Sequence, residues 1–167
     1  MITAAVMAIT SFFYNPHAHH AQLVKRTYHL RAWTTVVRHD TFTDAVTCTL
    51  AAPRMRYRAA TLIFHLRNGL ETTHAVFRVD DGPPAPVAAA FHGLEARGFF
   101  PRRGWIDNPA GGDVALPAAY VRGARRIWIR ATPRLPPNVY DVSRFDDALD
   151  RARDAGCPDN GFVDAKS

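Results

Sequence analysis

The feature that most constrains the fold is a single pair of cysteines, Cys48 and Cys157, placed far apart in a chain of 167 residues. In an exported domain an even number of cysteines predicts a disulfide, whereas in a reducing cytosol both would remain free thiols. Val46, Cys48 and Leu50 alternate onto one face of a predicted strand, which directs Cys48 into the core. A bond from there to Cys157 would close a loop of about 100 residues and hold the C-terminal segment on the sheet.

The N-terminal residues indicate in which cellular compartment the protein is found. No Lys, Arg, Asp or Glu precedes Lys25, and residues 1–13 form an apolar run that ends before the helix breaker Asn15-Pro16. This order is typical of a signal peptide, and the run is shorter than the roughly 20 residues that a helix needs to span a bilayer. We therefore expect a signal peptide over residues 1–21 and a periplasmic or secreted protein without a transmembrane anchor. The alternative is an N-terminal strand or a buried apolar arm.

Residues 22–157 are expected to form one domain, followed by a flexible tail over residues 158–167. Hydrophobic residues make up 47% and charged residues 22% of the chain, which suits a globular domain and argues against wholesale disorder. We find no internal repeat and no linker long enough to divide the chain.

Most of the domain has the composition and alternation of β-strands. Leu62, Phe64 and Leu66 share one face of a predicted strand, and Asn68-Gly69 predicts a hairpin that would pair this strand with the next one. Short helices are expected over residues 87–97 and 117–123. The predicted strands are 28–37, 42–50, 55–67, 71–80, 113–116, 125–131 and 138–142. The sequence therefore predicts a mainly β fold, a β-sandwich or a partly open barrel, with a C-terminal helix.

The C-terminal helix carries the clearest signals. Ser143 followed by Asp146 resembles a capping box, and Gly156 is a natural end. One stripe of apolar residues is expected to be buried: Phe145, Ala148, Leu149 and Ala152. Cys157 follows the helix directly, where it can reach a strand of the core.

The chain offers no recognised catalytic or metal-binding pattern. No serine lies in a G-x-S-x-G elbow, and Cys48, in the middle of a strand on its apolar face, is poorly placed for a nucleophile. The histidines at positions 17, 19 and 20 and the pair His65 and His74 lack the spacing of a structural or catalytic metal site. The sequence predicts a non-catalytic protein without a cofactor or a metal.

Arginine supplies nearly all of the basic charge, and the formal net charge is +6. Guanidinium groups bind phosphate well, although these arginines are scattered along the chain. Arginine and tryptophan interleave in two segments and predict a partner patch of Trp33, Arg102, Arg103, Trp105, Arg126, Trp128 and Arg130. Because such residues also stack on bases, a cytosolic nucleic-acid-binding β-barrel module is the alternative function.

The order of these features resembles the invasion-associated locus B family of small exported bacterial proteins. The matching pieces are the apolar start, Trp33 at the opening of a strand, Val46-Thr47-Cys48, the turn from Phe77 to Pro83 and the run from Val142 to Leu149. The resemblance implies a β-rich periplasmic or surface-associated protein and supplies no site residues. We therefore expect an exported, non-catalytic protein that binds a partner or an envelope component.

Overall fold

The computed structural model describes residues 23–163 with gaps at 59, 68–71, 73 and 91–111, so the expected signal peptide and the histidines at 17–20 lie outside the described residues. The described part contains ten strands and a C-terminal helix. The strands are β1 (Leu23–Leu30), β2 (Trp33–Asp40), β3 (Ala45–Ala52), β4 (Met55–Arg58), β5 (Thr61–His65), β6 (Val76–Val79), β7 (Ala85–Pro86), β8 (Asp113–Pro117), β9 (Arg126–Arg130) and β10 (Asn138–Asp141). The helical elements with described bounds are α3 (Phe145–Asp154) and two 3-10 turns, η2 (Ala118–Tyr120) and η3 (Asp159–Gly161), and residues 87–90 are helical as well.

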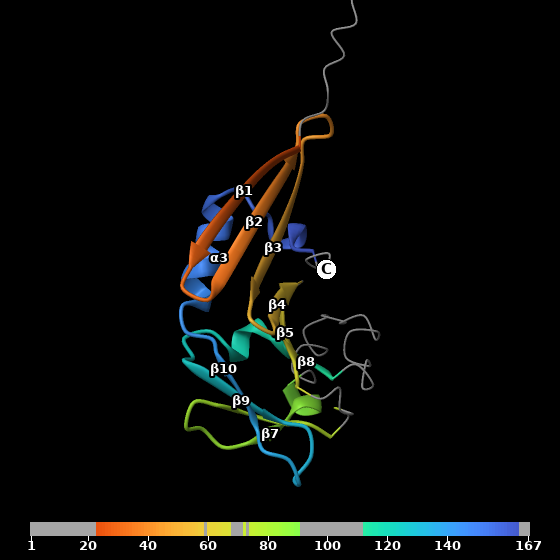
Figure 1. Cartoon of the computed structure of the whole chain (residues 1–167), viewed down its shortest axis with the longest axis vertical. Helices are drawn as coiled ribbons and strands as arrows, with labels where there is room; N and C mark the ends of the chain where they lie inside the picture. The colour runs from red at the N-terminus through yellow and green to blue at the C-terminus, as the bar shows by residue number, and fades with distance from the viewer. Residues whose placement is uncertain (1–22, 59, 68–71, 73, 91–111, 164–167) are drawn as a thin grey trace, which may run out of the picture.

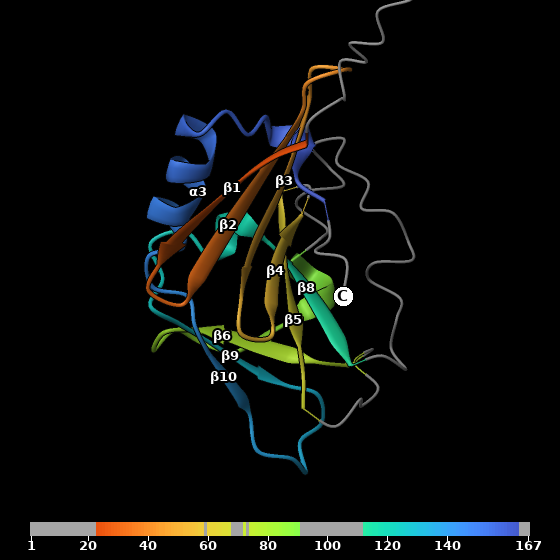
Figure 2. The ribbon, with the colours of Figure 1, turned by 45° about the horizontal axis from the view of Figure 1, so that its top comes forward.

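The strands form two antiparallel sheets. Six strands pair in the order β1-β2-β3-β4-β5-β8, and four pair in the order β10-β9-β6-β7. Figures 1 and 2 show α3 beside β1 and β2, and the four-stranded sheet at the other end, near β5 and β8. The fold is therefore mainly β with a C-terminal helix, as the sequence predicts.

Two predicted strands prove to be hairpins. The segment 28–37 turns at Arg31, where β1 ends and β2 begins, and the segment 55–67 turns beside Ala60, between β4 and β5. Both turn residues have positive φ, 53° at Arg31 and 60° at Ala60. Left-handed backbone normally favours glycine or asparagine. Because neither residue is of that type, the sequence carries no turn signal at these points.

The predicted hairpin at Asn68-Gly69 is wrong in its pairing. β5 pairs with β4 and β8 in the six-stranded sheet, whereas β6 pairs with β7 and β9 in the other sheet. Residues 68–71 themselves lie outside the described residues. The residues predicted to point inward, Leu62, Phe64, Leu66, Ala75 and Phe77, are buried, and Val79 is half-buried. The opposite face of β5 is not exposed as predicted, because Thr61 and Ile63 are buried too. Alternation fixes the face that a strand buries, but it does not fix the neighbour with which the strand pairs.

Helix α3 begins without the predicted capping box. Its N-cap is Arg144, with φ of 66° and no side-chain cap. The Ser143 hydroxyl donates instead to Asp141 at 2.5 Å, and the Asp146 carboxylate accepts the Gly123 amide at 2.7 Å. The buried stripe and the end of the helix are as predicted: Phe145, Ala148, Leu149 and Ala152 are buried, and Gly156 has φ of 93°.

The core has two aromatic centres that join the layers. Under α3, the ring of Phe145 packs against Trp33 and Tyr57, with centroid separations of 5.2 and 5.6 Å. Between the sheets, Phe64 meets Tyr140 edge to face at 5.0 Å. Such pairs add to the stabilisation that apolar burial gives. The six-stranded sheet is thus covered by the helix at one end and by the four-stranded sheet at the other.

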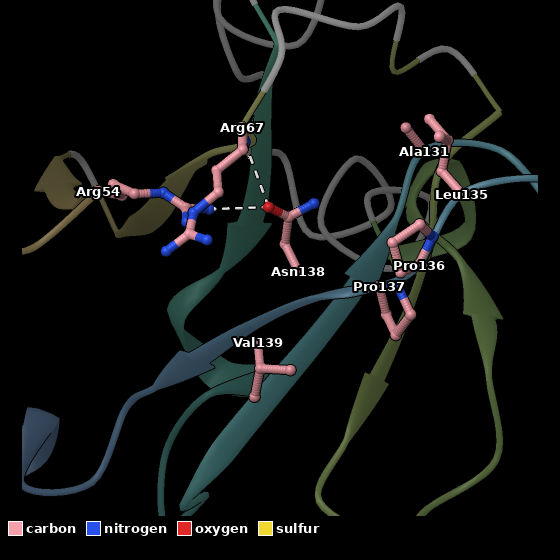
Figure 3. Close-up of a pocket in the computed structure, with 8 residues that line it drawn as sticks. All are labelled: Arg54, Arg67, Ala131, Leu135, Pro136, Pro137, Asn138 and Val139. Carbon is pink, nitrogen blue, oxygen red and sulfur yellow. Dashed lines mark hydrogen bonds between the residues drawn. The ribbon is translucent and has the colours of Figure 1, made fainter.

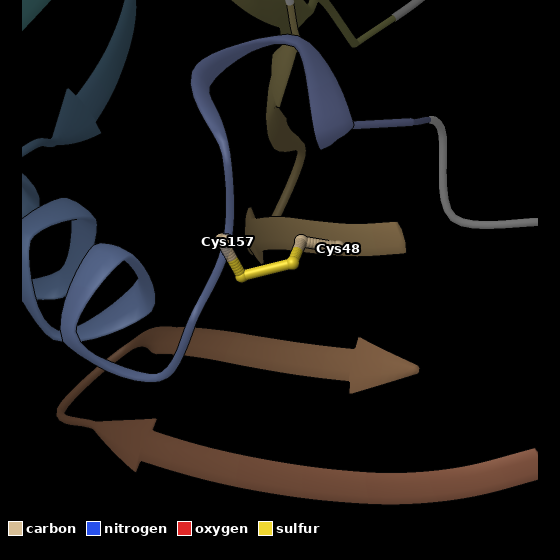
Figure 4. The surroundings of a disulfide bond; sticks show 2 residues. All are labelled: Cys48 and Cys157. Carbon is tan, nitrogen blue, oxygen red and sulfur yellow. A yellow bond between two sulfur atoms is a disulfide. The ribbon is translucent and has the colours of Figure 1, made fainter. Parts of the chain in front are cut away.

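The predicted disulfide is present. Cys48 on β3 is bonded to Cys157, which follows α3 after Gly156 (Figure 4). Both residues are buried, at 1% and 4% exposure. The bond therefore ties the end of the terminal helix to the centre of the six-stranded sheet.

After the disulfide the chain runs back to the six-stranded sheet as far as Val163. η3 follows Pro158, and Phe162 is buried against Tyr57 with ring centroids 4.9 Å apart. Val163 donates its amide to the Cys48 carbonyl at 2.8 Å. The apolar Phe162 thus returns the chain to β3, whereas Pro158, Asp159, Asn160 and Val163 are exposed. Residues 164–167 lie outside the described residues.

The predicted short helices are seen in part. Residues 87–90 are helical, and the rest of the expected helix lies outside the described residues. η2 falls within the predicted segment 117–123. Among the helices in the described part, none is long and apolar enough to cross a membrane.

Two buried tyrosines predict a loss of stability at alkaline pH. Burial raises the pKa of Tyr57 and of Tyr140 above the ordinary value of 10.0. Above about pH 10 the unfolded chain releases these protons while the folded protein keeps them, so the free energy of unfolding falls as the pH rises. We expect urea unfolding between about pH 9 and pH 11 to show this decline, and to show a shallower one for Tyr57→Phe combined with Tyr140→Phe. An equal slope in both proteins would contradict this prediction.

Candidate functional site

The structure separates the residues of the predicted partner patch. Trp33 is 1% exposed, and its indole nitrogen donates to the Ser143 carbonyl at 3.1 Å, so it belongs to the core and to no surface patch. Arg102, Arg103 and Trp105 lie outside the described residues. The remaining three members of the predicted patch, Arg126, Trp128 and Arg130, share one strand, β9.

These three side chains point away from the core. Ile127 and Ile129 on the same strand are fully buried, and strand residues alternate between the two faces of a sheet. In the registers with neighbouring strands, Trp128 stands opposite Arg78 of β6 and Val139 of β10. We call this outward surface the tryptophan face and define it by Arg78, Arg126, Trp128, Arg130 and Val139.

Trp128 is the centre of the tryptophan face. The Arg78 guanidinium carbon lies 4.9 Å from the centroid of the Trp128 ring system, a cation–π contact. Val139 is 46% exposed on the other side of the ring. Because Arg78 stacks on the indole, both side chains are held at the surface with little freedom to lose when a partner binds.

Two hollows meet at Trp128. One is a shallow hollow of about 250 Å³ that includes Val76, Arg78 and Arg130 with the rings of Pro84 and Pro137. The other is a wider polar cleft of about 640 Å³. Its charged lining residues are Arg31, Arg125, Arg126, Arg144, Asp80, Asp81 and Asp141. Trp128 lines both, so a ligand that covers this ring can extend into an apolar and a charged region.

Two of the three aspartates in the polar cleft are engaged by the protein. The Asp80 carboxylate accepts the amides of Arg125 and Arg126 at 3.0 and 2.8 Å. Asp141 accepts the hydroxyl and the amide of Ser143, and the hydroxyl bond is the main cause that lowers the pKa of Asp141. These carboxylates hold backbone in place and keep their charge, so the cleft carries four arginines against three aspartates.

A separate cleft of about 370 Å³ lies at the edge of the four-stranded sheet (Figure 3). Arg54, at the turn between β3 and β4, reaches across to β10. Its Nε donates to the His65 carbonyl at 3.1 Å, and its Nη2 donates to Asn138 Oδ1 and to the Tyr140 hydroxyl, both at 2.9 Å. The guanidinium also lies over the Tyr140 ring, 5.0 Å from its centroid.

Asn138 joins both arginines of this cleft. Its Oδ1 accepts from Arg54 and also from the Arg67 amide at 3.2 Å, and Figure 3 shows the two arginine side chains on the same side of it. Pro136 and Pro137 lie on the other side in that view. The break predicted between the strands 42–50 and 55–67 contains Arg54 (φ 61°), but no local pattern indicates that this side chain reaches β10 and forms a cleft there.

Other ionisable groups form no site of known chemistry in the described part of the chain. His65 Nδ1 lies 2.8 Å from Asp113, which also binds Arg56 at 2.7 Å. His74 is exposed, and the predicted hairpin that would have brought it near His65 does not form. Within the described ranges, no three His, Cys, Asp or Glu residues are grouped to hold a metal ion.

Comparisons with known proteins give no relative from which a function can be transferred: the chain matches no protein-family model, no curated protein and no solved structure. The functional argument therefore depends on the chemistry of these surfaces.

Proposed function

We propose that this protein is an exported, non-catalytic binding protein of the periplasm or the cell exterior, and that it contacts its partner or envelope component through the tryptophan face. The observation that carries the proposal is Trp128, an aromatic ring at the surface, stacked by Arg78 and flanked by Arg126 and Arg130. Tryptophan and arginine are the residues most enriched at the energetic centres of interfaces.

The disulfide supports the proposal that the protein is exported from the cytosol. Buried disulfides form and persist in oxidising environments and are rare in the cytosol. The bond between Cys48 and Cys157 agrees with the apolar, uncharged start of the sequence, from which we expect export. The resemblance to the invasion-associated locus B family supports a partner at the cell envelope.

The charge of the tryptophan face points to an anionic partner. It contains three arginines, and the adjoining polar cleft adds Arg31, Arg125 and Arg144. The four arginines of that cleft outnumber its three aspartates, and Arg78 and Arg130 add two further positive charges beside it. Phosphate or carboxylate groups on the partner would pair with these guanidinium groups.

The test is sedimentation of the purified, oxidised protein with vesicles prepared from the envelope of its native host. We expect Trp128→Ala, and separately Arg126→Gln combined with Arg130→Gln, to weaken binding by at least about tenfold. The matched control is Arg38→Gln combined with Arg151→Gln, which removes the same charge outside the tryptophan face and should bind like the wild type. Equal binding by all variants, or no binding by the wild type, would overturn the proposal.

A nucleic-acid-binding module remains the second candidate, favoured by the alternation of arginine and tryptophan on one outward sheet face. It predicts that a short single-stranded DNA or RNA quenches the fluorescence of Trp128 and that affinity falls steeply with salt. A titration at low salt that leaves the fluorescence unchanged would remove this candidate.

A further inference from the structure

The cleft beside Arg54 is a second charged surface with a different construction. Arg54 is fixed by three neutral acceptors, the His65 carbonyl, Asn138 and the Tyr140 hydroxyl, and none of them cancels its charge. These bonds use Nε and Nη2. Nη1 has no hydrogen-bond partner among the described residues, so its two N–H groups remain for a ligand.

Arg67 brings a second guanidinium to the same cleft. Its side chain is exposed and makes no ion pair or hydrogen bond in the part of the chain that the structure describes. The described residues that line the cleft include no carboxylate. The nearby Asp113 directs its two carboxylate oxygens at Arg56 and His65 instead. Two like charges held in one cleft repel each other, and an anion between them would relieve that repulsion.

The rest of the cleft is mostly apolar. Leu135, Pro136 and Pro137 come from the loop before β10, Ala131 and Val139 add further apolar surface, and Asn138 is the one uncharged polar side chain among the described lining residues. Proline rings are rigid, so this wall loses little conformational entropy when it is covered. A volume of about 370 Å³ falls within the range of small-ligand sites. The lining suits a molecule with an anionic group at one end and an apolar body at the other.

We propose that this cleft binds a carboxylate carried on an apolar body, as in a small organic acid or the C-terminal residue of a peptide. The carboxylate would receive the N–H groups of Arg54 Nη1 and the Arg67 guanidinium, and the apolar body would cover Leu135, Pro136 and Pro137. Planar guanidinium groups match a carboxylate in geometry as well as in charge. The cleft borders the tryptophan face at Val139, but the carboxylate would bind Arg54 and Arg67, which lie outside that face, and the variants of the test change none of the residues that define it.

The experiment is titration calorimetry of the oxidised protein with N-acetylleucine, compared with N-acetylleucinamide and with acetate. The amide lacks the charge and acetate lacks the apolar body. We expect N-acetylleucine to bind at least about tenfold more tightly than either. An acetylated tripeptide ending in leucine distinguishes the sources: tighter binding than N-acetylleucine indicates a peptide end, and equal binding indicates a free acid.

Arg67→Gln is the decisive variant, because the exposed Arg67 side chain makes no hydrogen bond or ion pair with the described residues and its loss should leave the fold unchanged. It should weaken binding of N-acetylleucine by about tenfold, in line with the loss of one charge-assisted contact. Arg134→Gln, in the exposed loop beside the cleft, removes the same charge and should have no effect. The inference is overturned if N-acetylleucinamide binds as well as the acid, if no ligand binds, or if both variants behave alike.

Discussion

Replacing Cys48 and Cys157 together with alanine should lower the free energy of unfolding by about 4 to 5 kcal/mol. The reason is the length of the loop that the bond closes, since the two residues are 109 positions apart. Without the bond the unfolded chain regains the conformations that this crosslink removes. Small domains have a total stability of about 5 to 15 kcal/mol, so the double variant should be near the limit of folding.

Urea unfolding of the variant and of the wild type, with and without reductant, measures this effect. Reductant should lower the midpoint of the wild type to that of the variant, and it should leave the variant unchanged. If the variant does not fold, reduction of the wild type alone provides the comparison. A loss below about 1 kcal/mol would mean that the core holds the C-terminal segment without the bond.

Phe145→Ala should lower the free energy of unfolding by about 3 to 5 kcal/mol. Phe145 is 1% exposed and packs against Trp33 and Tyr57, so its removal leaves a cavity between α3 and the six-stranded sheet. The near-ultraviolet circular dichroism of Trp33 should weaken as well, because its neighbouring ring is lost. Denaturant unfolding of the variant and the wild type measures the loss in the free energy of unfolding.

Arg151→Ala is the matched control on the same helix. Its side chain is exposed, so the substitution should change stability by less than about 0.5 kcal/mol. Phe145→Leu keeps much of the volume and should cost less than Phe145→Ala. Equal effects of Phe145→Ala and Arg151→Ala would contradict the packing of α3 described above.

The faces of the strands and of the helix were predictable because they depend on local periodicity. Phe64 and Ile127 are buried where alternation places them, and Phe145 and Leu149 lie in the stripe that a period of 3.6 predicts. The pairing of Cys48 with Cys157 followed from there being two cysteines and from a helix that ends just before the second one.

Turns and strand partners were not predictable for a physical reason. Arg31 and Ala60 adopt left-handed backbone although their residue types disfavour it, so the sequence does not mark these two turns, whereas Pro53 marks the break at Arg54. The Asn68-Gly69 signal suggested a neighbour for β5, but β8 from much later in the chain occupies that edge. Long-range pairing is decided by the packing of whole layers, which no local pattern records.

The candidate sites also differ in how far the sequence predicts them. Arg126, Trp128 and Arg130 were found because they alternate on a single strand. Trp33 was wrongly expected at the surface, since its strand begins at a turn that the sequence does not mark and α3 covers it. The cleft of Arg54 and Arg67 is assembled from three separate segments, so nothing in any one of them indicated a site.

The most direct test of the central claim, an exported and disulfide-bonded binding protein, is the intact mass of the protein isolated from its native host. It should be measured with alkylation before and after reduction. We predict a mass reduced by about twenty N-terminal residues and two cysteines that react only after reduction. A chain that keeps its N-terminal segment and carries two thiols open to alkylation without reduction would contradict the claim.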